Sequence, residues 1–305
     1  MRGAMLYAPR DIRVEDRADP KITEPTDVII RLAATCVCGS DLWAYRGIDA
    51  IDGPTPMGHE YAGVVEETGG DVHTIKPGQF VVGSFFASDN TCPICQAGYQ
   101  SSCVHRELVG ANGAQAEYLR VPLADGTLVA TPSTPDDDLI PSLLAVLAAR
   151  RLGAERIIAM SRHQPRQKLA IAYGATDIVT ERGDAGVSPI KELTGGLGAH
   201  SVIEAVGTQE SMMQAIRSTR PGGHVGYVGV AHGVELPGQE LFFSHVHLHG
   251  GPAPVRRFLP ELIDLIWNRQ IDPGQVFDLS LPLEQAADGY RAMDQRQAIK
   301  ALLRP

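Results

Sequence analysis

The sequence has little of three things: long hydrophobic runs, positive charge and cysteine. Its longest apolar run, from Leu143 to Ala149, is too short to span a bilayer. The net charge of −9 argues against a nucleic acid or an anionic membrane as a partner. The first residues do not show the charged, apolar and cleavage segments of a signal peptide, so we expect a cytoplasmic protein. The five cysteines are odd in number and all precede residue 104, which favours metal ligation over a disulfide framework.

The sequence also lacks the glycine-rich turn G-x-G-x-x-G, which binds a dinucleotide pyrophosphate at the start of a helix. Gly195, Gly196 and Gly198 follow a predicted helix and have the wrong spacing, whereas Gly222 and Gly223 precede a late strand. We therefore expect any dinucleotide to bind weakly.

What is present is an ordinary globular composition, 44% hydrophobic and 21% charged, in a chain long enough for two domains. Residues 1–130 contain short alternating or apolar runs separated by Gly, Pro and Asp, which predicts a β-rich barrel or sandwich. A linker follows. A helix is then predicted from Pro141 to Leu152, and after it strands alternate with helices, which predicts a parallel sheet built from βαβ units.

Four potential metal ligands occur within one short stretch: Asp89, Cys92, Cys95 and Cys103. Their spacing, with two, two and seven intervening residues, is that of a structural zinc lobe, and zinc accepts both thiolate and carboxylate. The alternatives are a surface loop without metal, or a disulfide if the protein is exported. We expect zinc, because three cysteines and an aspartate share the required spacing.

A second set of metal-type groups lies upstream, in Cys36 to Asp41 and Gly58 to Glu60. Thiolate and imidazole suit a borderline-soft cation such as zinc. Taken singly, Cys38 is better explained as a small buried hydrophobe and His59 as a hydrogen-bonded core histidine. The surrounding Cys-Gly-Ser-Asp and Gly-His-Glu sequences favour ligands.

Taken together and in order, these segments resemble the zinc-dependent medium-chain alcohol dehydrogenases. The resemblance covers nearly the whole chain and rests on Cys38-Gly-Ser-Asp, Gly58-His-Glu, the cysteine lobe, Lys76-Pro-Gly-Gln-Phe-Val-Val-Gly, Ile203-Glu-Ala-Val-Gly and Pro221-Gly-Gly-His-Val. It implies a GroES-like, β-rich catalytic domain with an inserted Rossmann-type parallel α/β domain, truncated because the first strand and its glycine turn are missing. The expected domains are residues 1–138, residues 139–253 and a C-terminal segment, 254–305, that returns to the catalytic domain.

The resemblance also implies a catalytic zinc held by Cys38 and His59, with Glu60 within reach of the metal. Ser40 would relay the alcohol proton, and Asp41 would orient His59. Near Trp43, some relatives have a relay histidine; tryptophan cannot carry a proton, so we expect it to shape the substrate pocket. Cys36 has no role in the family.

The third zinc ligand of relatives would fall within Leu144 to Ala149, which contains no donor. The nearest carboxylates are those of Asp136 to Asp138, Glu155 and Glu60. With two protein ligands, we expect the affinity of this site for zinc to fall.

The implied cofactor is NADP or NAD. Ser161 and Arg162 follow a predicted strand, at a position where NAD-preferring relatives carry an acidic residue; an arginine that faces the 2′-phosphate favours NADP. The alternative is a solvated arginine in a loop. The resemblance places six further residues at the dinucleotide, of which the last would meet the pyrophosphate: Val206, Gly207, Val228, Gly229, Val230 and Lys300. Their alternatives are ordinary strand-to-helix turns and an exposed lysine.

His245, His247 and His249 alternate, so a strand would place them on one face. We expect a polar strand face there rather than a metal site.

The function implied by the resemblance is hydride transfer between an alcohol or carbonyl substrate and NADP(H), by a homodimer or homotetramer. The alternative is a deletion-derived, zinc-binding pseudoenzyme without turnover, which the missing turn and third ligand favour. A zinc-free quinone reductase is disfavoured by the metal-type residues.

Overall fold

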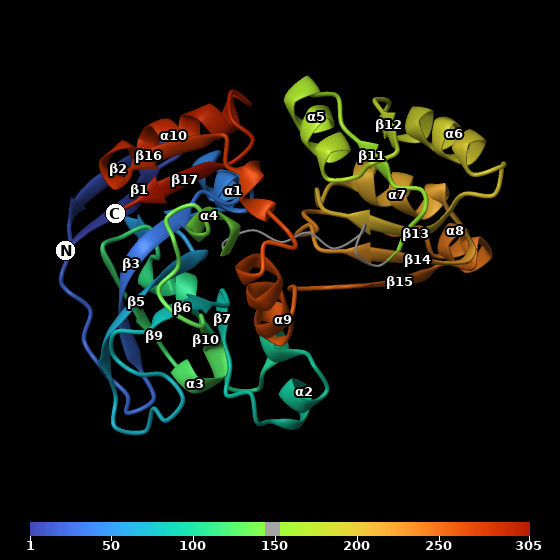
Figure 1. Ribbon diagram of the computed structural model, residues 1–305. Helices are drawn as coiled ribbons and strands as arrows, with labels where there is room; N and C mark the ends of the chain where they lie inside the picture. The colour runs from blue at the N-terminus through green and yellow to red at the C-terminus, as the bar shows by residue number, and fades with distance from the viewer. Residues whose placement is uncertain (144–152) are drawn as a thin grey trace. The chain divides into compact units, whose positions relative to one another are not determined.

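The computed structural model describes residues 1–143 and 153–305, which form two compact units (Figure 1). The first unit contains residues 1–143 and 254–305, and the second contains residues 153–253. The helix predicted from Pro141 to Leu152 lies largely outside the described residues, which contain only its first part, α4 (Ile140–Leu143). No helix among the described residues has the length and apolar content needed to cross a membrane.

A seven-stranded sheet is the framework of the first unit. Its strands follow the order β10-β6-β5-β3-β17-β16, and β9 also pairs with β3. Their bounds are β3 (Val28–Cys36), β5 (Tyr61–Thr68), β6 (Phe80–Gly83), β9 (Tyr118–Val121), β10 (Leu128–Ala130), β16 (Leu279–Pro282) and β17 (Ala301–Arg304). Because β16 and β17 come from the C-terminal segment, that segment completes the sheet of the first unit. The 3₁₀ helix η3 (Pro273–Val276) precedes β16.

Smaller elements surround this sheet. They are the antiparallel strands β1 (Arg2–Ala8), β2 (Asp11–Asp16) and β4 (Thr55–Pro56), the pair β7 (Phe86–Ala87) and β8 (Glu107–Leu108), the helices α1 (Asp41–Tyr45), α2 (Pro93–Gln96), α3 (Ala124–Thr127), α9 (Val255–Trp267) and α10 (Ala286–Asp294), and the 3₁₀ helices η1 (Gln100–Ser102), η2 (Val109–Asn112) and η4 (Leu283–Gln285).

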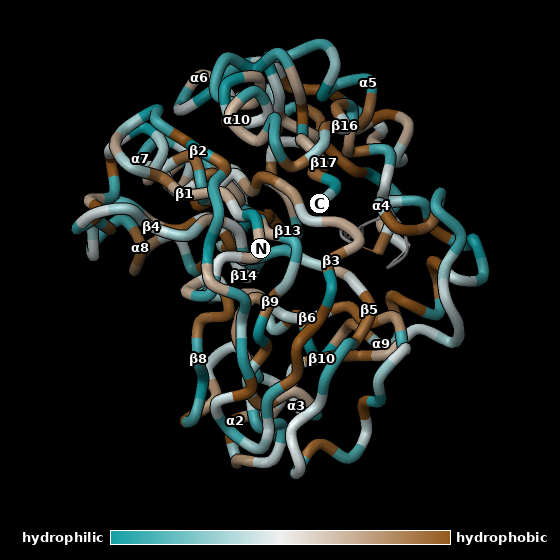
Figure 2. Tube along the Cα trace, turned by 90° about the vertical axis from the view of Figure 1, so that its left-hand side faces the viewer, coloured by the Kyte–Doolittle hydropathy of each residue, from teal (hydrophilic) through white to brown (hydrophobic). Residues whose placement is uncertain are grey.

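The two faces of the seven-stranded sheet are buried against different layers. Val28, Ile30 and Leu32 alternate along β3 and enter one core cluster. On α9, Leu259, Ile263 and Ile266 recur at helical spacing and pack with Phe80 and Val82 of β6 in another cluster. Figure 2 shows the matching hydrophobic colouring along β5 and β6.

The second unit contains only parallel strand pairs among its described residues, as the alternation of strands and helices predicts. Its elements are β11 (Ile158–Met160), α5 (Gln164–Ala172), β12 (Asp177–Val179), α6 (Asp184–Leu193), β13 (Ala199–Glu204), α7 (Gln209–Ser218), β14 (Thr219–Tyr227), α8 (Gly238–Ser244) and β15 (His247–Gly250).

The sheet of the second unit is in two pieces. β11 pairs with β12, and β13, β14 and β15 form a separate sheet; no pairing among the described residues joins β11 to β13. In a six-stranded dinucleotide-binding sheet the order is 3-2-1-4-5-6, so the first strand stands between the second and the fourth. The described strands fit positions 3-2 and 4-5-6, and the interruption falls where the first strand would stand.

Candidate functional site

Pairing between β3 and β5 brings the two upstream motifs together. Thr35 of β3 lies opposite Tyr61 of β5, so the residues just after β3 face those just before β5. Ser40 occupies the N-cap position of α1 without a side-chain capping bond, and the His59 side chain beside it is 21% exposed. The structure therefore assembles Cys38, Ser40 and His59 in one place.

Both ring nitrogens of His59 have partners. Nδ1 lies 3.2 Å from Oδ1 of Asp41, and Nε2 lies 3.3 Å from the hydroxyl of Ser40. Burial lowers the pKa of His59, but hydrogen bonds with Asp41 and Cys38 outweigh it and raise the pKa to about 11. The Asp41 contact orients the ring so that Nε2 faces Ser40.

A buried chain of hydrogen bonds holds Asp41 in turn. Its Oδ2 accepts from the backbone N–H of Cys38 at 2.9 Å and from the Gln115 side chain at 3.3 Å. The hydroxyl of Tyr290 donates to Oε1 of Gln115 at 3.0 Å. Gln115 and Tyr290 are distant along the chain and belong to no local motif, so the sequence does not predict their place beside Asp41.

The position before His59 requires a glycine, Gly58. Gly58 has a φ of +92°, and a Cβ there would lie 2.5 Å from Cγ of Gln115. Any other residue at Gly58 would displace the Gln115 side chain and the Asp41 carboxylate that it holds.

Glu60 and Lys300 form a partly buried ion pair. Nζ of Lys300 lies 2.6 Å from Oε2 of Glu60, and the thiol of Cys36 donates to the same oxygen at 2.6 Å. Burial raises the pKa of Glu60, but the charge of Lys300 and the Cys36 hydrogen bond lower it overall. Burial raises the pKa of the Cys36 thiol well above its usual value. Lys300 thus lies beside Glu60 in the first unit, and its contact with a pyrophosphate stays a prediction.

The described residues supply an incomplete set of ligands for a catalytic zinc. Cys38 and His59 offer the thiolate and imidazole that zinc prefers. The carboxylate of Glu60, the third candidate, is already held by Lys300 and Cys36. The position of the third ligand in relatives, Leu144 to Ala149, lies outside the described residues.

The downstream lobe, in contrast, fits a zinc ion. One ligand atom from each of Asp89, Cys92, Cys95 and Cys103 lies within 4.8 Å of the others, and the three thiols are buried. Sγ of Cys92 and Sγ of Cys103 are 3.9 Å apart, and all three cysteines are free. Four ligand atoms of types that zinc accepts thus lie close enough together to hold one ion.

Backbone N–H groups in the lobe favour the negatively charged forms of its ligands. Those of Val104 and Cys95 lower the pKa of the Cys92 thiol to about 7. Burial raises the pKa of Asp89, but N–H donors of Cys92 and Thr91 lower it overall. The sequence analysis missed His105, whose Nδ1 lies 2.7 Å from Oδ2 of Asp89.

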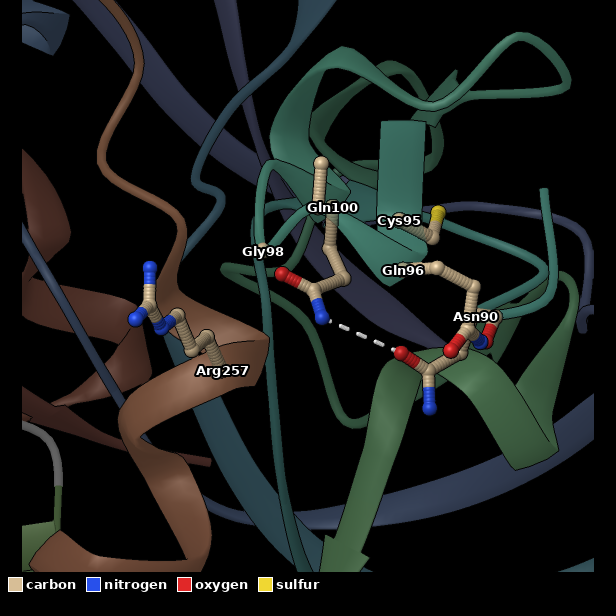
Figure 3. A pocket seen from close by; sticks show the side chains of 7 residues that line it. Asn90, Cys95, Gln96, Gly98, Gln100 and Arg257 are labelled. Atoms are coloured by element: carbon tan, nitrogen blue, oxygen red, sulfur yellow. Dashed lines mark hydrogen bonds between the residues drawn. The ribbon is translucent and has the colours of Figure 1, made fainter. Parts of the chain in front are cut away.

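An open hollow lies against the outside of the lobe. Figure 3 shows Arg257 of α9 on one side, and the Gln100 amide, which donates to Oδ1 of Asn90 at 3.1 Å, on the other. Gln96 lines it as well, and its side chain donates to the Asn90 carbonyl. These bonds brace the turn between Asp89 and Cys92.

In the second unit, Ser161 and Arg162 follow the carboxyl end of β11. The carbonyl of Ser161 accepts from the Gln167 side chain at 2.7 Å, and its hydroxyl accepts from the backbone N–H of His163 at 3.2 Å. Arg162 is exposed. In open parallel sheets ligands bind at this end of the strands, so the position suits a dinucleotide contact.

Val206, Gly207, Val228, Gly229 and Val230 come together at the carboxyl ends of β13 and β14. The Glu204 carboxylate accepts from the N–H groups of Val206 and Gly207, each at 2.8 Å, and so fixes the first turn. A Cβ at Gly207 would lie 2.0 Å from the carbonyl oxygen of Val230. Glycine therefore permits the close approach of the two strand ends.

Comparison with known proteins adds the family. Residues 24–133 match the alcohol dehydrogenase GroES-like domain, and residues 142–268 match the zinc-binding dehydrogenase domain. Over its full length the chain is 30% identical to zinc-type alcohol dehydrogenase B of Aspergillus flavus and covers 81% of it. It is 32% identical to a probable zinc-binding alcohol dehydrogenase of Mycobacterium tuberculosis and covers 89% of that protein. The first alignment extends over 348 positions although this chain has 305 residues, so that relative carries segments without a counterpart here.

Solved structures agree. The alcohol dehydrogenase of Thermus sp. ATN1 superposes with a TM-score of 0.87 at 27% identity, with 100% of this chain and 99% of that one covered. Zinc dependent alcohol dehydrogenase 2 of Streptococcus pneumonia gives 0.88 at 26% identity, with 100% and 98% covered. The expected combination of a GroES-like domain with a Rossmann-type α/β domain is confirmed.

Proposed function

This chain belongs to the zinc-type medium-chain alcohol dehydrogenases, and we propose that it transfers hydride between an alcohol or carbonyl substrate and NADP(H). The observation that carries the proposal is the line Asp41–His59–Ser40, in which each side chain lies within 3.3 Å of the next and Cys38 stands alongside. The proposed domains are residues 1–138, 139–253 and 254–305. A cytoplasmic homodimer or homotetramer is part of the same proposal.

In the proposed mechanism the four residues have distinct tasks. Cys38 and His59 would hold a zinc ion, which acts as a Lewis acid toward the substrate oxygen when bound. Asp41 fixes His59 with Nε2 toward the substrate side, and the Ser40 hydroxyl, which can both donate and accept, moves the substrate proton. Because the Glu60 carboxylate is already paired with Lys300, few protein ligands would remain for the zinc ion. We therefore expect zinc to bind weakly at this position.

The dinucleotide is proposed to bind at the carboxyl ends of the second unit's strands. Arg162 would pair with the 2′-phosphate of NADP, since no acidic residue is present there to bind the ribose diol of NAD. Val206, Gly207, Val228, Gly229 and Val230 would line the nicotinamide. The Asp89 to Cys103 lobe is proposed to hold a structural zinc.

A zinc-binding protein without turnover is the second candidate. The two-piece sheet favours it, because the interruption falls where the first strand would lead into the pyrophosphate-binding turn.

Initial rates decide between the two candidates. Zinc-loaded protein is assayed with NADP and a panel of primary and secondary alcohols, and with NADPH and the matching carbonyl compounds. The proposal expects a rate that needs zinc and is abolished in His59→Ala, while His73→Gln, an exposed histidine elsewhere in the first unit, leaves it unchanged. Activity that survives both chelation and His59→Ala would indicate a different chemistry.

A further inference from the structure

Three histidines gather on the open face of the second unit's larger sheet. β14 and β15 are parallel neighbours, with His224 paired to His247 and Gly226 paired to His249. Because alternate residues of a strand share a face, His247 and His249 point the same way, and the register places His224 beside them. All three residues are exposed.

The sequence predicts that His245, His247 and His249 share a strand face, whereas the structure groups His224 with His247 and His249. His245 precedes β15 and has a φ of +52°, so it lies outside the strand. His224, more than twenty positions earlier in the chain, takes its place through sheet pairing. The sequence contains the His-x-His pair, and the fold supplies the third imidazole.

The rings are close to one another. The ring centroids of His224 and His247 are 4.7 Å apart with an interplanar angle of 18°, and those of His224 and His249 are 6.1 Å apart at 72°. The residue opposite His249 is Gly226, and a Cβ built there would meet only the His249 ring, at 3.9 Å. Among the described residues outside its immediate chain neighbours, no side chain other than that of His249 comes within 4 Å of this position.

The strands beneath are anchored, whereas the imidazoles have no polar partner. On the opposite face Val225 is fully buried and packs with Leu248 and with Met212 and Ile216 of α7. Within residues 1–143 and 153–305, no ring nitrogen of His224, His247 or His249 takes part in a hydrogen bond or an ion pair. Three imidazoles on a fixed backbone, none of them engaged by a described residue, are therefore available as metal ligands once their rings turn toward one ion.

We propose that His224, His247 and His249 bind one divalent transition-metal ion, such as Ni²⁺, Cu²⁺ or Zn²⁺, at a site separate from the cysteine lobe and from Cys38 and His59. Neutral imidazole suits these cations and not Mg²⁺ or Ca²⁺, which take oxygen ligands. Two rings are stacked, so their nitrogens do not yet converge; binding turns the rings about their broad χ2 torsions, and water completes the coordination.

The test uses untagged protein, dialysed so that only tightly held zinc remains, and titrated with NiCl₂ in a calorimeter. We expect one Ni²⁺ per chain in addition to any ion bound at Cys38 and His59, with a dissociation constant on the order of micromolar, unaffected by excess Mg²⁺, and tighter binding of Cu²⁺. Each of His224→Gln, His247→Gln and His249→Gln weakens binding by at least about tenfold, and the triple variant abolishes it.

His73→Gln is the matched control, because His73 is also exposed but lies in the first unit. Unchanged circular dichroism and melting temperature in each variant show that the exposed substitutions preserve the fold. Ni²⁺ binding that is equally strong in the triple variant, or detectable in the wild type only at millimolar concentrations, would overturn the proposal.

Discussion

Asp41 and His59 are joined by a contact of 3.2 Å between Oδ1 and Nδ1, and the same carboxylate accepts the backbone N–H of Cys38. One charged group thus positions both proposed ligands of the catalytic zinc. Loss of the Asp41 charge should therefore disturb the site even in a substitution that keeps the shape of the side chain.

Asp41→Asn tests this contact in the metal-free protein. Since the pKa of folded His59 is raised from 6.5 to about 11, protonated His59 contributes stability that is complete below pH 6.5 and is lost as the pH rises toward 11. In Asp41→Asn we expect a lower pKa of His59 by NMR titration and a smaller loss of unfolding free energy over that range. Equal pH dependence in the two proteins would show that Asp41 does not hold the protonated ring.

Lys300→Met tests the partly buried ion pair. The substitution keeps the length of the side chain but leaves the Glu60 carboxylate without its cation, so we expect a loss of about 1–3 kcal/mol in unfolding free energy by denaturant titration. Lys76→Met, at an exposed lysine of the same unit, should change stability little. A loss no larger than that of the control would contradict the structural role of Lys300.

Cys92→Ser tests the zinc lobe. With all four ligands present we expect one tightly held zinc per chain after dialysis, and Cys92→Ser should lose it and melt at a lower temperature, because metal binding contributes to folding. Ser102→Ala, an exposed polar change in the same lobe, should keep the zinc. Zinc content that is unchanged in Cys92→Ser would eliminate the assignment.

Arg162→Ala tests the dinucleotide preference. A charge-assisted contact with the 2′-phosphate is worth about 1.5–3 kcal/mol, so NADP should bind roughly tenfold or more tightly than NAD, and the variant should lose this preference. Lys191→Ala, which removes an exposed positive charge from α6, should retain it. Both dinucleotides should bind weakly, and micromolar or tighter binding of NAD in calorimetry would show that another segment rebuilds the phosphate site.

The sequence predicts best what is local. The spacing of Asp89 to Cys103 identifies the lobe, and the alternation of strands with helices predicts the parallel strand pairs of the second unit. It does not reveal Gln115, whose side chain reaches Asp41, or Tyr290, whose hydroxyl reaches Gln115, because only the folded chain brings these distant residues together. The same reason hides the pairing of Lys300 with Glu60, which are joined by the return of the C-terminal strand to β3.

Only part of the histidine set, His224, His247 and His249, could be predicted from the sequence. Alternation along a strand predicts that His247 and His249 share a face, but only the parallel register of β14 and β15 adds His224. Strand pairing depends on which segments are present in the sheet, and this information is not contained in the local pattern.

The transfer of deuterium from an alcohol to the dinucleotide tests the proposed function most directly. Zinc-loaded protein is incubated with NADP at a high concentration and with alcohols deuterated at the carbinol carbon, and the reduced dinucleotide is analysed by mass spectrometry. Our account predicts deuterium-labelled NADPH from the wild-type protein and none from His59→Ala. If the folded, zinc-loaded wild type forms no labelled NADPH at any dinucleotide concentration, the chain is a zinc-binding protein without turnover and the proposed dehydrogenase function is wrong.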